Sequence, residues 1–491
     1  MMALLHFSSS FCLSTTIPNL FSSLRSPTKC PHRSKSGRIP AAASSFPAPP
    51  PDSAIADFWR WLGEKGALPK PSPPVRPGLV PEGLGLVAER DILRNEVVVE
   101  VPKQLWINAD VVAASEIGPV TLGLKPWVAI SLFLLREKGL DAASPWRPYL
   151  DILPPETDSS IFWSEEELSE IQGTQLLNTT LGVKEYVQSE FAEVEDKVIL
   201  PNNHLFPSKI TAAEFLWAFG ILRSRAFSGF RGDKLVLIPF ADLVNHNASI
   251  TSEDVCWDIK GKGLFSREQI FSLRTPVFVN AGQQIYIQYD LGKSNAELAL
   301  DYGFIESNNK GREVYTMTLE ISESDPFYGD KLDIVESNGL GDIAYFDIVL
   351  GRPLPPLMLP YLRLAVLGGT DAFLLESIFR NSVWGHLELP VSRSNEETIC
   401  CVVLDACASA LSLYQTTIEE DEKLLEKGEL DARSKIAVGV RSGEKRVLHQ
   451  IQEIFRSREV ELETLEYYQE RRLKDLGLIG QQGEIIFWES N

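Results

Sequence analysis

The sequence predicts an α+β protein, in which a β-rich fold is interrupted by a helical insert and followed by an all-α domain. Short apolar runs between turn residues, at Leu84–Ala88 and Val97–Val101, are typical of brief strands. Apolar residues at helical spacing then fill residues 110 to about 228, and they return after residue 309. With 491 residues, the chain is long enough for two or three domains that each bury a core.

The first fifty residues differ in composition from the rest of the chain. They are rich in serine and contain no acidic residue before Asp52. This composition is typical of an organelle transit peptide, and the excess of serine over arginine favours the chloroplast. We therefore expect a transit peptide and linker over residues 1–50 and a mature protein in the chloroplast stroma. The basic residues of this leader are Arg25, Lys29, Arg33, Lys35 and Arg38.

The charge balance limits the classes of partner. The chain has a net charge of −20, and removal of a leader with five positive groups would leave −25. A field of this sign repels nucleic-acid phosphates and anionic lipids, and it attracts basic segments of other proteins. No stretch approaches the ~20 apolar residues that cross a bilayer. We expect a soluble protein that binds neither nucleic acid nor membrane, although the charge could serve solubility alone.

The predicted elements divide the chain into three parts. β character returns at Leu235–Pro239 and Gln284–Tyr289, after the helical insert. Beyond Gly303 the pattern is helical and ends in a long amphipathic segment, Glu444–Leu476. We expect the leader to be followed by a β-fold with its insert over 51–308 and by a helical domain over 309–491.

Two clusters combine residues that suit polar ligands. In the first, Gly83 and Gly85 would let a ligand approach the backbone of a strand closely, although an ordinary turn is the alternative. No Gly-x-Gly-x-x-Gly motif follows, which disfavours a dinucleotide fold. In the second, Asp242 and His246 follow Arg225. That pair could bind a metal or act as a base, but a structural histidine in a polar loop is the alternative.

The third cluster is aromatic. Tyr286 and Tyr289 lie in an expected strand, and Tyr302 follows in the string Asp-Tyr-Gly-Phe. Regular alternation would place Tyr286 and Tyr289 on opposite faces of that strand. Core packing is the alternative interpretation. The cysteines near residue 400, with His386, match no recurrent zinc pattern and are better explained as small buried residues.

The order of these clusters resembles that of the SET-domain protein lysine methyltransferases. Members share a Gly-x-Gly strand, an Asn-His loop, a strand ending in Tyr-Asp and a following Tyr-Gly-Phe. The helical insert and the helical tail are similar to those of one branch, the plant Rubisco large-subunit lysine methyltransferases. The similarity covers residues 52 to 491 and includes long strings. Those strings are Leu124–Trp127, Phe219–Arg225, Asn295–Phe304, Gly368–Phe373 and Tyr467–Arg472.

The resemblance implies a SET fold with a helical substrate-binding domain, and S-adenosyl-L-methionine as methyl donor without a metal. Arg225 would hold the carboxylate of this cofactor, because a guanidinium fork binds a carboxylate bidentately. The other contacts would come largely from the backbone. The implied cofactor residues are Glu82, Gly83, Leu84, Arg225, Asn245 and His246.

The same resemblance implies a narrow channel for the lysine, with Tyr289 at the point of methyl transfer. The Tyr289 hydroxyl would orient the reacting groups, since a phenol of ordinary pKa is a poor base at neutral pH. An apolar channel would favour the neutral amine that attacks the methyl group. The implied substrate residues are Arg225, Asp242, Trp257, Tyr289 and Tyr302.

The family implies two protein substrates, the Rubisco large subunit and chloroplast fructose-bisphosphate aldolase. Gly229 stands where close relatives can carry a basic residue, and relatives that act on Rubisco typically show a histidine near the position of Val255. These departures make aldolase at least as strong a candidate. One alternative is a methyltransferase of nuclear proteins, which the leader disfavours. The other is a catalytically silent SET-fold module that only binds proteins, which the intact Arg225, Asn245 and Tyr289 disfavour.

Overall fold

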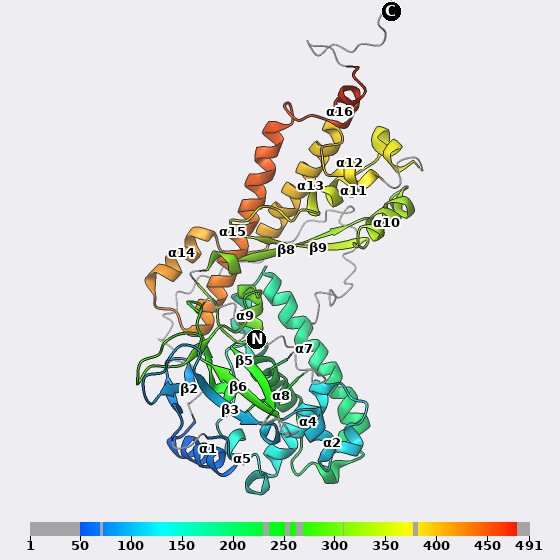
Figure 1. Cartoon of the computed structure of the whole chain (residues 1–491). Coiled ribbons are helices and arrows are strands. Elements are labelled where there is room, and N and C mark those ends of the chain that lie inside the picture. Colours follow the sequence, from blue (N-terminus) through cyan, green and yellow to red (C-terminus); the bar gives the residue numbers. More distant parts are fainter. Residues whose placement is uncertain are drawn as a thin grey trace, which may run out of the picture. The chain divides into compact units, whose positions relative to one another are not determined.

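The computed structural model describes residues 50–68, 72–228, 235–250, 256–261, 269–307, 309–376 and 382–478 (Figure 1). The predicted transit peptide lies outside these residues. The chain forms two compact units. Within the described ranges, the first comprises residues 50–163, 178–292 and 299–303, and the second comprises residues 164–177, 293–298 and 304–478. The domain boundary expected at residue 308 stays a prediction, because the second unit also includes the earlier segments Ser164–Leu177 and Lys293–Leu298.

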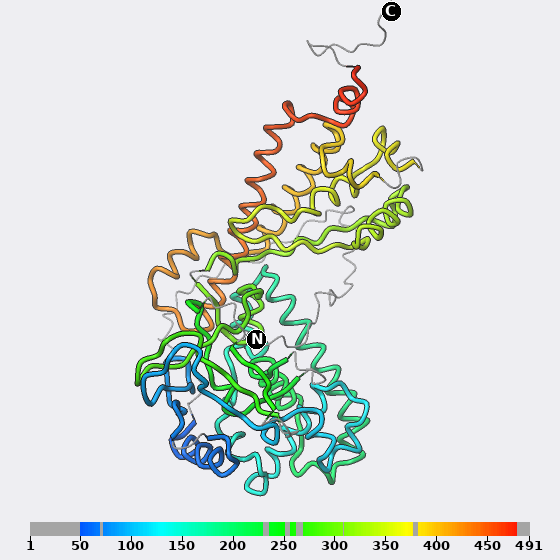
Figure 2. Tube along the Cα trace, in the orientation of Figure 1, coloured from blue at the N-terminus to red at the C-terminus, as the bar shows by residue number. Residues whose placement is uncertain are grey.

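Small sheets form the β-part of the first unit. The hairpin β1–β2 is antiparallel, with Val75 opposite Ala88. The order of the three-stranded sheet is β3-β6-β5, so the early strand β3 pairs with the later strand β6, which also pairs with β5 (Figure 2). The two-residue strands β4 and β7 pair in parallel. The strands are β1 (Val75–Val80), β2 (Gly83–Ala88), β3 (Val97–Pro102), β4 (Asn245–His246), β5 (Trp257–Gly261), β6 (Gln269–Arg274) and β7 (Tyr286–Ile287).

The helical insert has its own aromatic core. Trp127 of α4 packs against Phe215 and Phe219 of α8, with ring centroids 5.5 and 5.1 Å apart. Helix α8 begins with a capping box in which Thr211 and Glu214 satisfy each other's backbone N–H groups. The first helices of the chain are α1 (Asp52–Glu64), α2 (Ala109–Ala114), α3 (Gly118–Thr121), α4 (Pro126–Gly139), α5 (Arg147–Leu150), α6 (Glu165–Ser169), α7 (Gln175–Val194), α8 (Ala212–Arg225) and α9 (Asn295–Asp301). The helices from α2 to α8 confirm the predicted helical insert.

Two expected strands are shorter than predicted. Leu235–Pro239 forms no regular strand, because only Val236 and Leu237 make bridges, each to a different segment. In Gln284–Tyr289, only Tyr286–Ile287 is a strand. The apolar residues predict burial correctly at both places, but a strand also needs one continuous partner to pair with.

The second unit is mainly helical. Its long helix α15 contacts α13, α14 and the antiparallel ribbon β8–β9 (Figure 1). The sequence predicts only helices in this part of the chain, so the two-stranded ribbon is an additional element that the structure shows. The elements are β8 (Val314–Glu320), α10 (Tyr328–Ser337), β9 (Ile343–Val349), α11 (Met358–Ala365), α12 (Val383–Leu387), α13 (Arg393–Leu411), α14 (Ile418–Lys427), α15 (Ala432–Glu461) and α16 (Tyr468–Asp475).

Several buried charged groups in the second unit are paired. Nε of Arg363 donates to Glu396 at 2.6 Å, and both side chains are almost fully buried. Glu444 accepts from the Tyr414 hydroxyl at 2.7 Å, and burial raises the pKa of Glu444 to about 7. Cys400 and Cys407 are buried, as predicted, whereas Cys401 is exposed and contradicts that prediction, because it lies on the outer face of α13. No single helix in the described ranges is long and apolar enough to cross a membrane.

We predict that Gly303→Ala lowers the free energy of unfolding by about 3 kcal/mol, because two costs combine. Gly303 has a φ of +77°, and an added Cβ would lie 2.4 Å from the backbone of Asp158 and Ser159. Gly282 is the matched control, since its φ is +80° and nothing lies within 4 Å of the added atom. Guanidinium unfolding should show a loss of only about 1 kcal/mol for Gly282→Ala. Equal losses would show that the contact at Gly303 is unimportant.

Candidate active site

The first two predicted clusters lie side by side. Asn245 of β4 is opposite Tyr286 of β7, and its Nδ2 donates to the Leu84 carbonyl of β2 at 3.3 Å. Gly85 makes this approach possible, since a Cβ there would lie 2.9 Å from Asn245 Nδ2 and 2.6 Å from Gln284 Nε2. The glycine is therefore required by close packing of the strands, and the ordinary-turn interpretation does not account for it.

Glu82 and Gly83 occupy the exposed approach to β2. The Tyr286 hydroxyl donates to the Glu82 carboxylate at 3.2 Å, which ties the turn before β2 to β7. Gly83 has a φ of +105°, a conformation that side-chain-bearing residues rarely adopt. Tyr286 thus points to Glu82, whereas Tyr289 has a different set of partners.

Asp242 is buried between two hydrogen-bond donors. Its Oδ2 accepts from the Tyr149 hydroxyl at 2.8 Å and from Arg225 Nη1 at 3.4 Å. The same Nη1 donates to the backbone carbonyl of Asp242 at 3.1 Å. Burial raises the pKa of Asp242, although Arg225 and then Tyr149 oppose this shift. Oδ1 of Asp242 is buried and has no hydrogen-bond partner in the described part of the chain.

The turn that presents Asp242 is strained. Phe240 has a φ of +81° and is fully buried, and Trp59 packs edge-on against its ring at 5.8 Å. A 3₁₀ turn, Ala241–Leu243, follows directly and leads into β4. A non-glycine residue in this region costs roughly 1–3 kcal/mol, so the surrounding core must hold it in place. Strain of this kind is typical of functional loops.

Tyr289 is buried beside the Asn-His segment. Its hydroxyl donates to the Val244 carbonyl at 2.9 Å, and its backbone N–H donates to Nδ1 of His246 at 3.2 Å. The ring of Tyr302 lies 5.0 Å from that of Tyr289. Burial raises the pKa of both tyrosines well above the usual range. Both hydroxyls therefore stay protonated at neutral pH, so that neither is a base.

The two arginines of the Arg-Ser-Arg string have different partners. Nε of Arg223 donates to the buried Asp301 carboxylate at 2.7 Å, and its guanidinium lies over the Phe219 ring. Arg225 contacts Asp242 instead. The two positions are chemically alike in the sequence, so only the family resemblance selects Arg225 as the cofactor residue, and that role stays a prediction.

Two further aromatic residues bear on the predicted set of substrate residues, Trp257, which belongs to it, and Tyr149, which does not. Trp257 of β5 stacks on Phe271 at 5.7 Å and meets Phe227 edge-on at 6.5 Å. Tyr149 was missed, because a lone tyrosine in a helical insert gives no signal that it bonds to Asp242. Its hydroxyl is fully buried, and burial followed by the nearby Asp242 charge raises its pKa well above the usual range.

The site fits the cofactor that the sequence predicts. Nη1 of Arg225 is used by Asp242, whereas Nε and Nη2 have no partner among the described residues. A guanidinium edge with two such donors is the group that binds a carboxylate bidentately. Among those same residues, no group of three metal-ligating side chains lies together.

Comparisons with known proteins agree with this geometry. The family model described as Rubisco LSMT substrate-binding matches residues 322–448. The chloroplastic [fructose-bisphosphate aldolase]-lysine N-methyltransferase of Arabidopsis thaliana is 64% identical over 451 residues, covering 92% of this chain and 92% of its own length. The chloroplastic Rubisco large subunit N-methyltransferase of Nicotiana tabacum is 65% identical over 436 residues, covering 89% of this chain and 88% of its own.

A solved structure, that of Rubisco LSMT bound to AdoMet, is 59% identical with a TM-score of 0.80 and covers 88% of this chain and 98% of its own. This chain belongs to the plant Rubisco and aldolase lysine methyltransferase family.

Membership of the lysine methyltransferase family confirms the resemblance, the fold class and the enzyme class that the sequence predicts. The expected chloroplast location is also confirmed, since both relatives are chloroplastic. The roles of the individual site residues stay predictions of the sequence and the geometry.

We predict that Tyr149→Phe lowers the free energy of unfolding at pH 7.5 by about 1–3 kcal/mol, because the Asp242 carboxylate loses a buried donor. The Tyr149 hydroxyl stabilises the ionised form of Asp242. The loss should therefore shrink as pH falls through the pKa of Asp242. Chemical unfolding at pH 7.5 and pH 4.5 measures both effects.

The control for this prediction is Tyr186→Phe, whose hydroxyl accepts from the exposed Lys125 ammonium. It should lose less than about 1 kcal/mol, since water can replace the hydroxyl there. A Tyr149→Phe loss that does not change with pH would contradict a bond to the ionised carboxylate.

Proposed function

We propose that this chain transfers methyl groups from S-adenosylmethionine to lysine side chains of chloroplast fructose-bisphosphate aldolase. The observation that supports this most directly is the convergence of Arg225, Asp242 and Tyr289 in a chain that is 64% identical to an aldolase-lysine methyltransferase. Rubisco large subunit is the second candidate substrate, because a relative of equal similarity methylates it. Val255, which bears on this choice, lies outside the described residues.

Arg225 has two tasks in this proposal. Its Nη1 is anchored to Asp242, which holds the guanidinium plane in one orientation. Its remaining donors then face the carboxylate of the cofactor, while Asn245 and the Glu82–Leu84 backbone lie along β2 and β4. Tyr149 is a positioning residue, because it acts on Arg225 only through Asp242.

S-adenosylmethionine, when bound, supplies a methyl group on a positively charged sulfur. The lysine amine must lose its proton before it can attack, since its ordinary pKa is ~10.4. The ring of the half-buried Tyr302 packs against the buried Tyr289, and an apolar setting of this kind would disfavour the ammonium form of a lysine bound there. Asp242 Oδ1 is a buried acceptor without a protein partner among the described residues, and it is available to an incoming amine.

Tyr289 orients groups and does not remove protons. Its high pKa keeps the hydroxyl protonated, and its bond to the Val244 carbonyl fixes the direction of the oxygen lone pairs. A preorganised dipole at the transfer point stabilises the transition state without paying for reorganisation during the reaction. Burial of the ring also excludes water from this part of the site.

We predict that Tyr289→Phe lowers kcat by about 10²-fold, as loss of one preorganised hydrogen-bonding group does in other enzymes. Cofactor affinity measured by calorimetry should change less than about threefold, because the hydroxyl bonds to the protein backbone. Tyr328→Phe, which removes a hydroxyl bonded to Asp342, should leave both quantities unchanged. Equal losses of turnover and affinity would contradict the role given to Tyr289.

The proposed substrate is tested by mass spectrometry. Purified aldolase and Rubisco are incubated separately with the protein and isotopically labelled S-adenosylmethionine. We expect methyl groups on lysines of aldolase. Methylation of Rubisco alone would transfer the proposal to the second candidate. Labelling of neither protein, with cofactor binding intact, would favour the silent binding module instead.

A further inference from the structure

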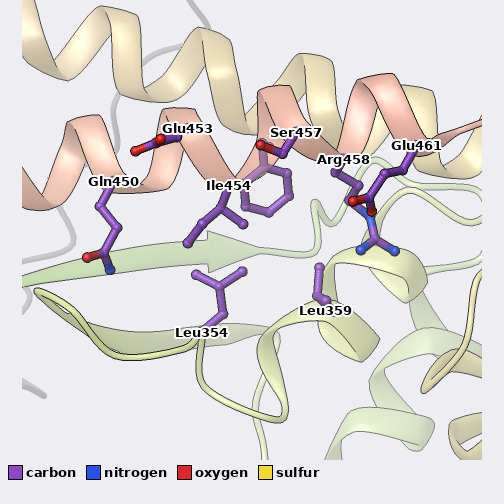
Figure 3. Close-up of a pocket in the computed structure, with 9 residues that line it drawn as sticks. Leu354, Leu359, Gln450, Glu453, Ile454, Ser457, Arg458 and Glu461 are labelled. Carbon is purple, nitrogen blue, oxygen red and sulfur yellow. The ribbon is translucent and has the colours of Figure 1, made fainter.

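The second unit contains a partly apolar cavity that is separate from the methyl-transfer residues. Its volume is about 360 Å³, and it lies between α15 and the segment leading into α11. Ile454 of α15 points toward Leu354 and Leu359 across this space (Figure 3). All three are only partly buried, so the floor of the cavity is apolar and open to a ligand. A cavity of this size holds a single large apolar side chain.

Carboxylates border the same cavity. Glu453 and Glu461 line it and are exposed, and neither has an ion-pair partner among the described residues. They are eight residues apart on α15, which corresponds to about 12 Å along a helix. Two unpaired carboxylates beside an apolar floor favour a ligand that combines an apolar group with positive charge.

The cation that also lines the cavity is engaged within the unit. Nε of Arg458 donates to Glu396 at 2.6 Å, and Glu396 is fully buried and shared with Arg363. The Arg458 side chain is only 18% exposed. The charge that this cavity presents outward is therefore mainly that of Glu453 and Glu461.

Glu461 occupies an unfavourable position for an acid. It is the last residue of the 30-residue helix α15, where the helix dipole favours cations. Its neighbour Val460 is 81% exposed, although it is apolar. A cation of a bound partner beside Glu461 would offset this unfavourable placement of an acid at a helix C-terminus.

We propose that this cavity docks a segment of the protein substrate in which an apolar side chain is flanked by basic residues. The apolar side chain would lie on Ile454, Leu354 and Leu359, and the basic ones would meet Glu453 and Glu461. An extended chain rises about 3.3 Å per residue, so cations about four positions apart span the two carboxylates. This inference rests on the proposed function for its partner, and the net charge of −20 agrees with a basic partner.

The charge half of the proposal is tested in the full-length protein by the double substitution Glu453→Lys and Glu461→Lys. Reversal turns attraction into repulsion, so KM for aldolase should rise about tenfold while kcat and cofactor affinity stay constant. The matched control is Glu429→Lys with Glu459→Lys, which makes the same change in net charge at exposed positions outside the cavity. An unchanged KM in the first variant would overturn the proposal.

A fall in KM for the Glu453→Lys, Glu461→Lys variant would also overturn the proposal. It would mean that the two carboxylates hold another part of this chain in the cavity, where that part competes with the substrate. The apolar half is tested by Ser457→Trp, which places a large ring in the cavity from an exposed position. We expect a similar rise in KM for this variant. A normal KM would show that the apolar floor does not take part.

A binding measurement separates this inference from the proposed function. A synthetic peptide with the pattern Lys-Ala-Leu-Ala-Lys is titrated into the wild-type protein and the Glu453→Lys, Glu461→Lys variant by calorimetry. The wild type should bind it at least about tenfold more tightly, and a peptide with glutamate in place of lysine should not bind. Peptide binding without aldolase methylation would overturn only the proposed substrate. Absent or equal binding would overturn the docking site, even if aldolase is methylated.

Discussion

The site in the first unit depends on the hydrogen bonds that Tyr149 and Arg225 donate to the buried Asp242 carboxylate. Removing a carboxylate from water costs several kcal/mol, and it is tolerated only when charged or polar partners surround it. Here the partners come from two parts of the helical insert, Tyr149 of α5 and Arg225 at the end of α8. The helical insert is therefore part of the site, because it supplies the two side chains that donate hydrogen bonds to the Asp242 carboxylate.

This arrangement lowers stability for the sake of function. The pKa of Asp242 is higher in the folded protein than its ordinary value, so ionising the group costs stability once the pH exceeds its unfolded pKa. The strained Phe240 adds a further cost directly before it. Perturbed ionisable groups next to backbone strain are typical of active sites, and both features converge on the residues that the family resemblance selects.

The sequence predicted features that local physics determines, and it missed those that depend on tertiary partners. The strand beginning near Leu84 is confirmed, since it depends on residues close by in the chain. The strand at Leu235–Pro239 was wrong, because its apolar residues find burial without a continuous pairing partner. The role of Tyr149 could not be predicted from the sequence, since its hydroxyl donates to Oδ2 of Asp242, a residue far away in the chain.

The central claim is that Tyr149 and Arg225 act on the cofactor as one unit through Asp242. The most direct test is a double-mutant cycle with Tyr149→Phe and Arg225→Lys, read as the affinity for S-adenosylmethionine in calorimetry. We expect Tyr149→Phe to weaken binding in the presence of Arg225, and to have no further effect once Arg225 has been replaced. Additive effects of the two substitutions would show that Tyr149 and Arg225 act separately, and would contradict this account.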